Sequence, residues 1–133
     1  MNNKLYDFSE LAGRILIAAI FVLSGFGKIG GYAGTQAYME SQGVPGALLP
    51  LVIVTELGGG LLVVLGLWTR LAALALAGFS VLAALLFHAN FGDQMQMILF
   101  LKNFAMAGGF LFLVAHGAGA LSLDGWRARR AAS

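Results

Sequence analysis

The alternation of long apolar runs with short polar breaks along the chain predicts four membrane-spanning helices. The apolar runs lie at about residues 11–26, 47–67, 71–88 and 97–115. Each approaches the roughly 17–25 residues with which a helix crosses a bilayer. The second and third runs are separated only by "LWTRLA", which predicts a tight antiparallel hairpin with Arg70 at its tip. The fourth run is the least regular, because Lys102 and Asn103 interrupt it.

The composition supports the same class of protein. Of the 133 residues, 59% are hydrophobic and only 11% are charged, whereas a soluble domain carries about 25% charged residues. The N-terminus contains Asp7 and Glu10 and does not resemble a signal peptide, so we expect the first apolar run to be retained as an anchor. The sequence therefore predicts an all-α integral membrane protein, a single four-helix transmembrane bundle over residues 1–133.

The distribution of basic residues predicts the orientation of this bundle. Cytoplasmic loops carry an excess of Lys and Arg. The side that holds both termini and the turn between spans two and three has Lys4, Arg14, Arg70, Arg127, Arg129 and Arg130, and the other side has Lys28 and Lys102. We therefore expect cytoplasmic termini, with Arg14 extending to the headgroups and a short surface helix near residues 35–41 on the outer side.

Several classes of function are disfavoured by composition. The chain has no cysteine, so it carries no disulfide, thiolate metal site or thiol chemistry of its own. The net charge is +2, without a basic patch that would indicate nucleic acid. A metal site is not predicted, because His88 is the only histidine near the membrane carboxylate. Expected partners are the lipid bilayer and either another protein or further copies of this chain.

Ionisable residues inside the apolar runs are the candidate functional groups. At about 1.5 Å of rise per residue, Glu56 lies roughly 21 Å and His88 roughly 27 Å from Arg70. By the same measure Lys102 lies roughly 24 Å from Ala118, and Lys28 ends the first span near that level. These groups from different helices therefore reach a similar depth, in the outer part of the bilayer.

A charge in a bilayer usually faces the bundle interior and is paired. We predict that Glu56 pairs with Lys102, because a neutral pair loses less on leaving water than a lone charge does. His88 either hydrogen-bonds to this pair or faces outward, and Asn103 with Gln94 or Gln96 is a candidate to extend the network. Lys28 is a further candidate for the site because it lies near the same level. Small residues let membrane helices approach closely, so the glycines near these charges are predicted to pack the helices together: Gly25, Gly59, Gly60, Gly108 and Gly109.

Two interpretations of the charged residues remain open at this stage. In the first, Glu56 and Lys102 form a structural pin that fixes helix register. In the second, they line an outward-facing polar pocket that binds a small molecule. The aromatic residues Tyr38 and Trp68 are more typical of the membrane interface than of a cofactor site.

The order of several motifs resembles a known family. They are "GRILIAAIFVLSGFGKIGG", "GTQAYMESQGVP", "TELGGGLLVVLGLWTRLAA", "HANF" and "QMILFLKNFAMAGGFLFLVAHGAGALSLD". Together they cover about residues 11–124 and resemble the DoxX family of small four-helix bacterial inner-membrane proteins. By position, the motif residues are Arg14, Lys28, Glu56, Arg70, His88, Lys102 and Asn103.

The resemblance implies a location in the bacterial inner membrane and two alternative functions. Some relatives resemble the membrane subunit of a quinone-linked oxidoreductase, which makes quinone the candidate ligand. In that case the redox centre lies on a partner, because this chain encodes none, and whether the chain itself is an enzyme stays undecided. The alternative is a non-enzymatic scaffold, assembly factor or small-molecule binding protein.

Overall fold

The structure is a computed structural model that describes residues 3–132. Its helices are α1 (Asn3–Gly30), α2 (Tyr32–Ser41), α3 (Leu49–Ile53), α4 (Gly59–Leu65), α5 (Thr69–Phe87), α6 (Gln94–His116) and α7 (Leu123–Ala132). A 3-10 turn at Gly46–Leu48 precedes α3, and a π-helical segment at Val54–Gly58 joins α3 to α4. Over these residues the chain forms no strand, which confirms the all-α prediction.

Four stretches of the described chain are long and apolar enough to cross a membrane, as the sequence predicted. They are Asn3–Gly30, Gly46–Leu65, Thr69–Phe87 and Gln94–His116. The first and last of these stretches are longer than the apolar runs, because α1 and α6 include polar residues at their ends. The surface helix expected near residues 35–41 is α2, which begins three residues earlier at Tyr32.

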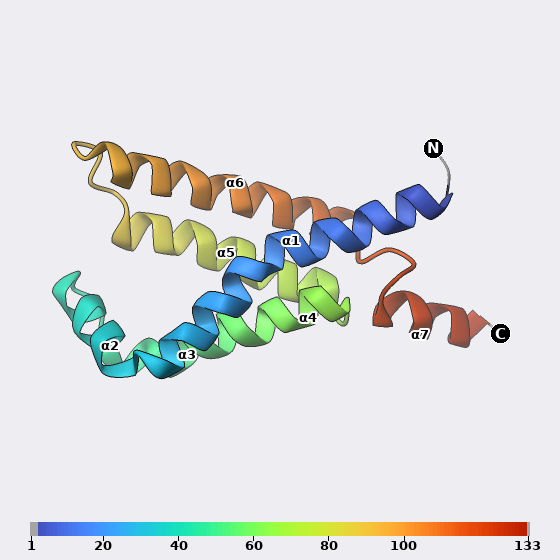
Figure 1. Ribbon diagram of the computed structural model, residues 1–133, viewed down its shortest axis with the longest axis horizontal. Helices are drawn as coiled ribbons and strands as arrows, with labels where there is room; N and C mark the ends of the chain where they lie inside the picture. The colour runs from blue at the N-terminus through green and yellow to red at the C-terminus, as the bar shows by residue number, and fades with distance from the viewer. Residues whose placement is uncertain (1–2, 133) are drawn as a thin grey trace.

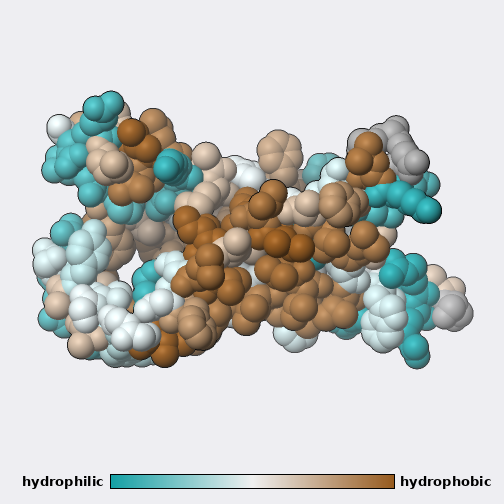
Figure 2. All heavy atoms as spheres, in the orientation of Figure 1, coloured by the Kyte–Doolittle hydropathy of each residue, from teal (hydrophilic) through white to brown (hydrophobic). Residues whose placement is uncertain are grey.

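The two ends of the bundle differ in construction (Figure 1). Both termini and the α4–α5 turn lie at one end, which we call the terminal end. Helix α2 and the α5–α6 connection lie at the other, which we call the loop end. Helix α1 runs obliquely across α4 and α5, while α6 lies along α5. Apolar residues cover the middle of the face in Figure 2 and polar residues gather at its two ends, as expected for a bundle in lipid.

The apolar core lies where α1 crosses the other helices. Phe21 of α1 contacts Phe79 of α5 and Phe110 of α6 edge to face, with ring centroids 6.3 and 5.4 Å apart. Small side chains such as Ala18 and Ala73 are fully buried around these rings. Aromatic edge-to-face pairs among small residues hold three helices together in lipid, where close packing replaces the hydrophobic effect.

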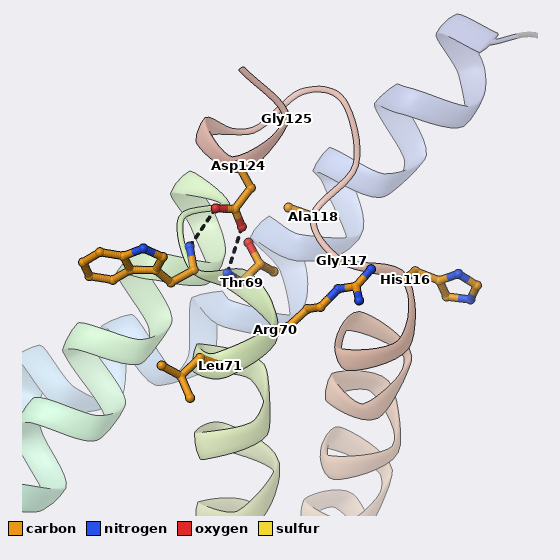
Figure 3. A pocket seen from close by; sticks show the side chains of 9 residues that line it. Thr69, Arg70, Leu71, His116, Gly117, Ala118, Asp124 and Gly125 are labelled. Carbon is orange, nitrogen blue, oxygen red and sulfur yellow. Dashed lines mark hydrogen bonds between the residues drawn. The ribbon is translucent and has the colours of Figure 1, made fainter. Parts of the chain in front are cut away.

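A tight turn joins α4 to α5, as "LWTRLA" predicted. Gly66 ends α4 in the left-handed conformation with φ 69°, and Trp68 takes φ 48°, which is uncommon for a residue with a side chain. Asp124 stabilises this turn, since its carboxylate accepts hydrogen bonds of 2.9 Å from the Trp68 and Thr69 N–H groups. The start of α7 therefore caps the start of α5 (Figure 3).

Arg14 lies inside the terminal end and does not extend to the headgroups, so that expectation is wrong. Its exposed fraction is 1%. Its guanidinium donates to the carbonyls of Val63 and Val64 at 3.1 Å each, and to the carbonyl of Leu121. The carbonyls at the end of a helix have free acceptor capacity, and that of Val63 also accepts from the Gly66 N–H at 3.1 Å. The two terminal nitrogens of Arg14 donate these hydrogen bonds and join α1, α4 and the segment before α7.

Candidate functional site

Two glycines bring α1 close to the segment that carries Glu56. A methyl group placed on Gly25 would lie 2.8 Å from the Leu57 backbone nitrogen. One placed on Gly60 would lie 2.9 Å from a Val22 methyl group and 3.2 Å from the Val22 backbone nitrogen. Any larger residue at either position would force the backbones apart. The contact places the loop-end half of α1 directly against the π-helical segment.

The π-helical segment presents Glu56 to the interior. Segments of this kind are rare, and they occur frequently at functional sites because they locally alter the rotation of the helix. Glu56 has an exposed fraction of 4%. A carboxylate so deep in an apolar span is costly without a counter-charge.

Lys28 supplies the counter-charge. Its Nζ lies 2.7 Å from Glu56 Oε1, and it donates a hydrogen bond of 2.6 Å to Ser24 Oγ. The predicted pairing of Glu56 with Lys102 is therefore wrong. The depth estimate brought Lys28 to the level of the acid, and α1 approaches the segment of Glu56 through Gly25. Ser24 lies one turn before Lys28 on the same face of α1, where a lysine side chain can reach it.

The ion pair lies in the wall of a cleft of about 590 Å³. The cleft is bounded by α1, α2, the α3–π-helical segment, α5 and α6. Its polar lining includes Ser24, Lys28, Thr35, Tyr38, Thr55, Glu56, His88 and Asn103, and its other walls are mainly Leu, Val, Ile, Phe, Ala and Met. Ligand sites of about 300–1,000 Å³ commonly combine apolar walls with a few placed polar groups. On the face shown in Figure 2 the molecule is hollowed near α2.

The loop end of the cleft is bordered by His88 and by an aromatic pair. His88 Nδ1 lies 2.9 Å from Gln96 Oε1, so this nitrogen is suited to donate to the amide oxygen. Tyr38 of α2 stacks on Phe87 of α5, with ring centroids 5.6 Å apart. Helix α2 is held in place by the hydrogen bond from Gln36 Nε2 to the Gly46 carbonyl and by the burial of Met39. These contacts fix the border of the cleft.

The remaining predicted residues divide between the cleft and the lipid-facing surface. Asn103 lines the cleft, whereas the adjacent Lys102 is exposed and outside its lining. Gly59 packs on Leu76, and Gly109 faces the end of the Ile17 side chain. Gly108 faces open space.

Ser24 and Thr55 line the cleft although the sequence-based prediction did not include them. The signal in each case was sequence proximity to a charged residue. Ser24 lies one helical turn before Lys28, and Thr55 directly precedes Glu56. Thr55 donates to the Leu51 carbonyl at 2.8 Å, so its hydroxyl is satisfied by its own helix.

A second hollow, of about 690 Å³, lies at the terminal end beside the α4–α5 turn (Figure 3). It is larger than the cleft but more open, and its charged residues Arg70 and Asp124 sit at the surface. Burial disfavours the charged form of Asp124, but hydrogen bonds from Thr69 and Trp68 and the charge of Arg127 outweigh it. The pKa of the carboxyl therefore lies below its ordinary value. This carboxylate is engaged in capping α5, so we assign the candidate site to the cleft.

Fold and cleft together define a small multi-span membrane protein. Among the residues that the structure describes, one ion pair lies in the wall of a cleft that is otherwise largely apolar. The DoxX family model matches residues 9–89. The chain therefore belongs to the DoxX family.

Two relatives match over almost their whole length. Inner membrane protein YqjF of Escherichia coli is 52% identical, over 92% of this chain and 94% of the relative. Inner membrane protein YphA of the same organism is 39% identical, over 91% of this chain and 96% of the relative. With four apolar helices of spanning length among residues 3–132, the chain is a multi-pass protein of the bacterial inner membrane.

A third relative, named "Putative oxidoreductase CatD", of Bacillus subtilis, is 33% identical over 56% of each chain. No solved structure matches this chain.

Proposed function

We propose that the cleft binds a quinone and that the chain serves as the membrane subunit of an oxidoreductase complex. The observation that carries the proposal is the Lys28–Glu56 ion pair in the wall of a cleft that is otherwise mainly apolar. A quinone has the matching chemistry, since it combines a ring with two carbonyl oxygens and an apolar tail. The ring oxygens meet the polar wall and the tail follows the apolar walls.

Lys28 provides the hydrogen-bond donor for a quinone oxygen. An ammonium group has three N–H donors, of which Ser24 and Glu56 engage two. The third is free to point into the cleft. A donor in a low-dielectric site stabilises the negative charge that develops on a quinone oxygen as it is reduced.

Glu56 provides a proton-exchanging group beside that donor. Reduction of a quinone to a quinol takes up two electrons and two protons. In the proposed reaction, the Glu56 carboxylate takes up a proton from the loop end, where His88 borders the cleft, and passes it to a ring oxygen, once for each of the two protons. The electrons come from a partner protein. The relative named "Putative oxidoreductase CatD" supports this class of reaction by its name.

The proposed orientation follows from the basic residues. Lys4, Arg70 and the arginines of α7 belong to the terminal end, so we place that end in the cytoplasm. The cleft and His88 then face the outer leaflet. Reporter enzymes that are active on only one side of the membrane, fused at Ser133 and inserted after Gly92, test this placement, and activity of the same reporter at both sites would contradict it.

Quinone binding is tested on protein purified together with its surrounding native lipid. Extracts are analysed for quinone by mass spectrometry, and the emptied protein is titrated with a short-chain ubiquinone. We expect bound quinone in the wild type. Glu56→Gln and Lys28→Met should each weaken binding about tenfold or more, because each removes a hydrogen bond to a charged group.

Lys102→Met is the matched control. It removes an ammonium group near the same depth but outside the lining of the cleft. Its quinone affinity should equal that of the wild type. Equal losses in Lys28→Met and Lys102→Met would show that overall charge, and not the cleft, governs binding. A wild type that neither retains nor binds quinone would reject the proposal and favour the scaffold function.

A further inference from the structure

Lys102 is a charged residue on the outside of a membrane-spanning helix. It lies roughly 12 Å along α6 from Gln94, and its neighbour Asn103 lines the same cleft as Glu56. Its side chain is exposed, and among residues 3–132 it makes no ion pair or hydrogen bond. An unpaired ammonium group facing lipid is unfavourable, and such groups are normally paired.

The face of α6 around Lys102 is also poorly covered by the rest of the bundle. In the most apolar part of α6, 11% of the residues are buried, compared with 33% in α5. Ala105 is exposed near Lys102, and a methyl group on Gly108 would meet nothing within 4 Å. Leu101 and Phe112 belong to the same stripe of α6 as these two small residues and are 59% and 70% exposed. Lys102 borders this stripe next to Ala105, and Gly108 lies about 120° around the helix from it. Small residues beside a polar one are typical of contacts between membrane helices.

From these two observations we propose that the Lys102 face of α6 docks a transmembrane helix of another protein, and that this helix carries a carboxylate at the depth of Lys102. The partner is defined by charge complementarity. A carboxylate neutralises the ammonium group, and the small residues allow the partner backbone to come close. The proposal does not rest on quinone binding, because Lys102 lies outside the lining of the cleft.

A second copy of this chain does not meet the requirement. Its acidic residues are Asp7, Glu10, Glu40, Glu56, Asp93 and Asp124. Glu56 is buried against Lys28. Asp93, which caps α6, lies roughly 13 Å along the axis from Lys102. Each of the other four belongs to one end of the bundle. A parallel pair of copies therefore has no free carboxylate at the level of Lys102, so the partner is a different protein.

The experiment places a photoreactive amino acid at position 105 of the full chain in the membranes of its native host. The same probe at Leu16 of α1, which is 75% exposed, is the matched control. We expect one protein adduct from position 105 and none from position 16. Lys102→Met should reduce the yield at least tenfold, and Lys102→Arg should preserve it because the positive charge remains. Ala105 is replaced by the probe, so Gly108→Phe tests the small-residue groove separately and should also reduce the yield.

Identification of the adduct decides the proposal. Support requires an integral membrane protein with an Asp or Glu in the cross-linked helix. It also requires that Lys102→Glu abolish the adduct and that a Lys in place of the partner's acid restore it. The proposal is overturned by an adduct between two copies of this chain, by label found only on lipid, by a yield unaffected in Lys102→Met, or by the absence of any adduct.

Discussion

Arg14 and Lys28 are both cations of α1 inside the membrane-spanning bundle, but they are accommodated in different ways. Arg14 donates to backbone carbonyls of two other segments and lies outside the lining of both hollows described above. Lys28 is paired with a single carboxylate in the wall of a cleft. A buried charge in a membrane protein indicates function by default. The comparison shows that the partners of the charge determine whether it stabilises the fold or remains available to a ligand.

The largest effect is expected from Arg14. Arg14→Met leaves the Val63, Val64 and Leu121 carbonyls without their charged donor, and we expect the free energy of unfolding to fall by about 3–5 kcal/mol. Reversible unfolding in mixed micelles measures the change. Arg14→Lys should recover only part of it, because an ammonium group cannot reproduce the planar arrangement of donors.

The control for Arg14 is Leu16→Met on the lipid-facing side of the same helix, which should leave unfolding nearly unchanged. If Arg14→Met unfolds like this control while quinone binding is lost, Arg14 would belong with the functional cations and the contrast with Lys28 would fail.

A smaller effect is expected at Gly25, where α1 meets the π-helical segment. Gly25→Ala places a methyl group 2.8 Å from the Leu57 backbone nitrogen. The forced separation should destabilise the fold by about 1–3 kcal/mol and weaken the Lys28–Glu56 contact. Gly27→Ala is the matched control, because a methyl group there meets nothing within 4 Å. Equal stability of the two variants would show that this close approach is not needed.

A double-mutant cycle tests which lysine interacts with Glu56. The cycle of Glu56→Gln with Lys28→Met should give a coupling free energy of about 1–2 kcal/mol, within the range for groups in contact. The cycle with Lys102→Met should give less than about 0.5 kcal/mol. A larger coupling to Lys102 than to Lys28 would contradict the ion pair described above.

The same cycle separates a structural pin from a binding site. The double variant Glu56→Gln, Lys28→Met leaves no unpaired charge in the wall of the cleft, so its stability should exceed that of Lys28→Met alone. Recovered stability with quinone binding still absent is the result expected for a binding site. Recovery of both properties would mean that the pair only fixes helix register.

Hydropathy was sufficient to predict the four spans and the tight turn between the second and the third. It could not predict which face of each helix points inward, because a membrane helix is apolar on nearly all sides. Adjacent residues on a helix point about 100° apart, so a shared depth does not place Lys102 and Asn103 on one face, and only Asn103 lines the cleft. Neither the oblique path of α1 nor the π-helical segment at Glu56 produces a periodic pattern in the sequence. These two features make Lys28 the partner of Glu56.

Arg14 illustrates the same limit at the terminal end. The apolar run placed it near the start of the first span, from where a long cationic side chain is expected to reach the headgroups. Helix α1 instead begins eleven residues earlier, at Asn3, and Arg14 lies beside the end of α4. The carbonyls that it binds belong to residues distant in sequence, at the end of α4 and before α7. Only the packing of α1 on α4 brings them within reach.

The smallest effect is expected from Asp124, which completes the terminal end by capping α5. Because the pKa of its carboxyl is lowered in the fold, its stabilising contribution is present at neutral pH and is lost as the pH falls through that lowered pKa. Asp124→Asn should therefore be less stable than the wild type at pH 7, by less than about 1 kcal/mol at this partly exposed site. The difference should vanish in acid, where both side chains are neutral. Unfolding curves of the two proteins between neutral and acidic pH measure it. A difference that persisted below the carboxyl pKa would show that the shape of the side chain, and not its charge, holds the turn.

Quinone affinity should be the same in both proteins at neutral pH, because the cap is at the opposite end from the Lys28–Glu56 cleft.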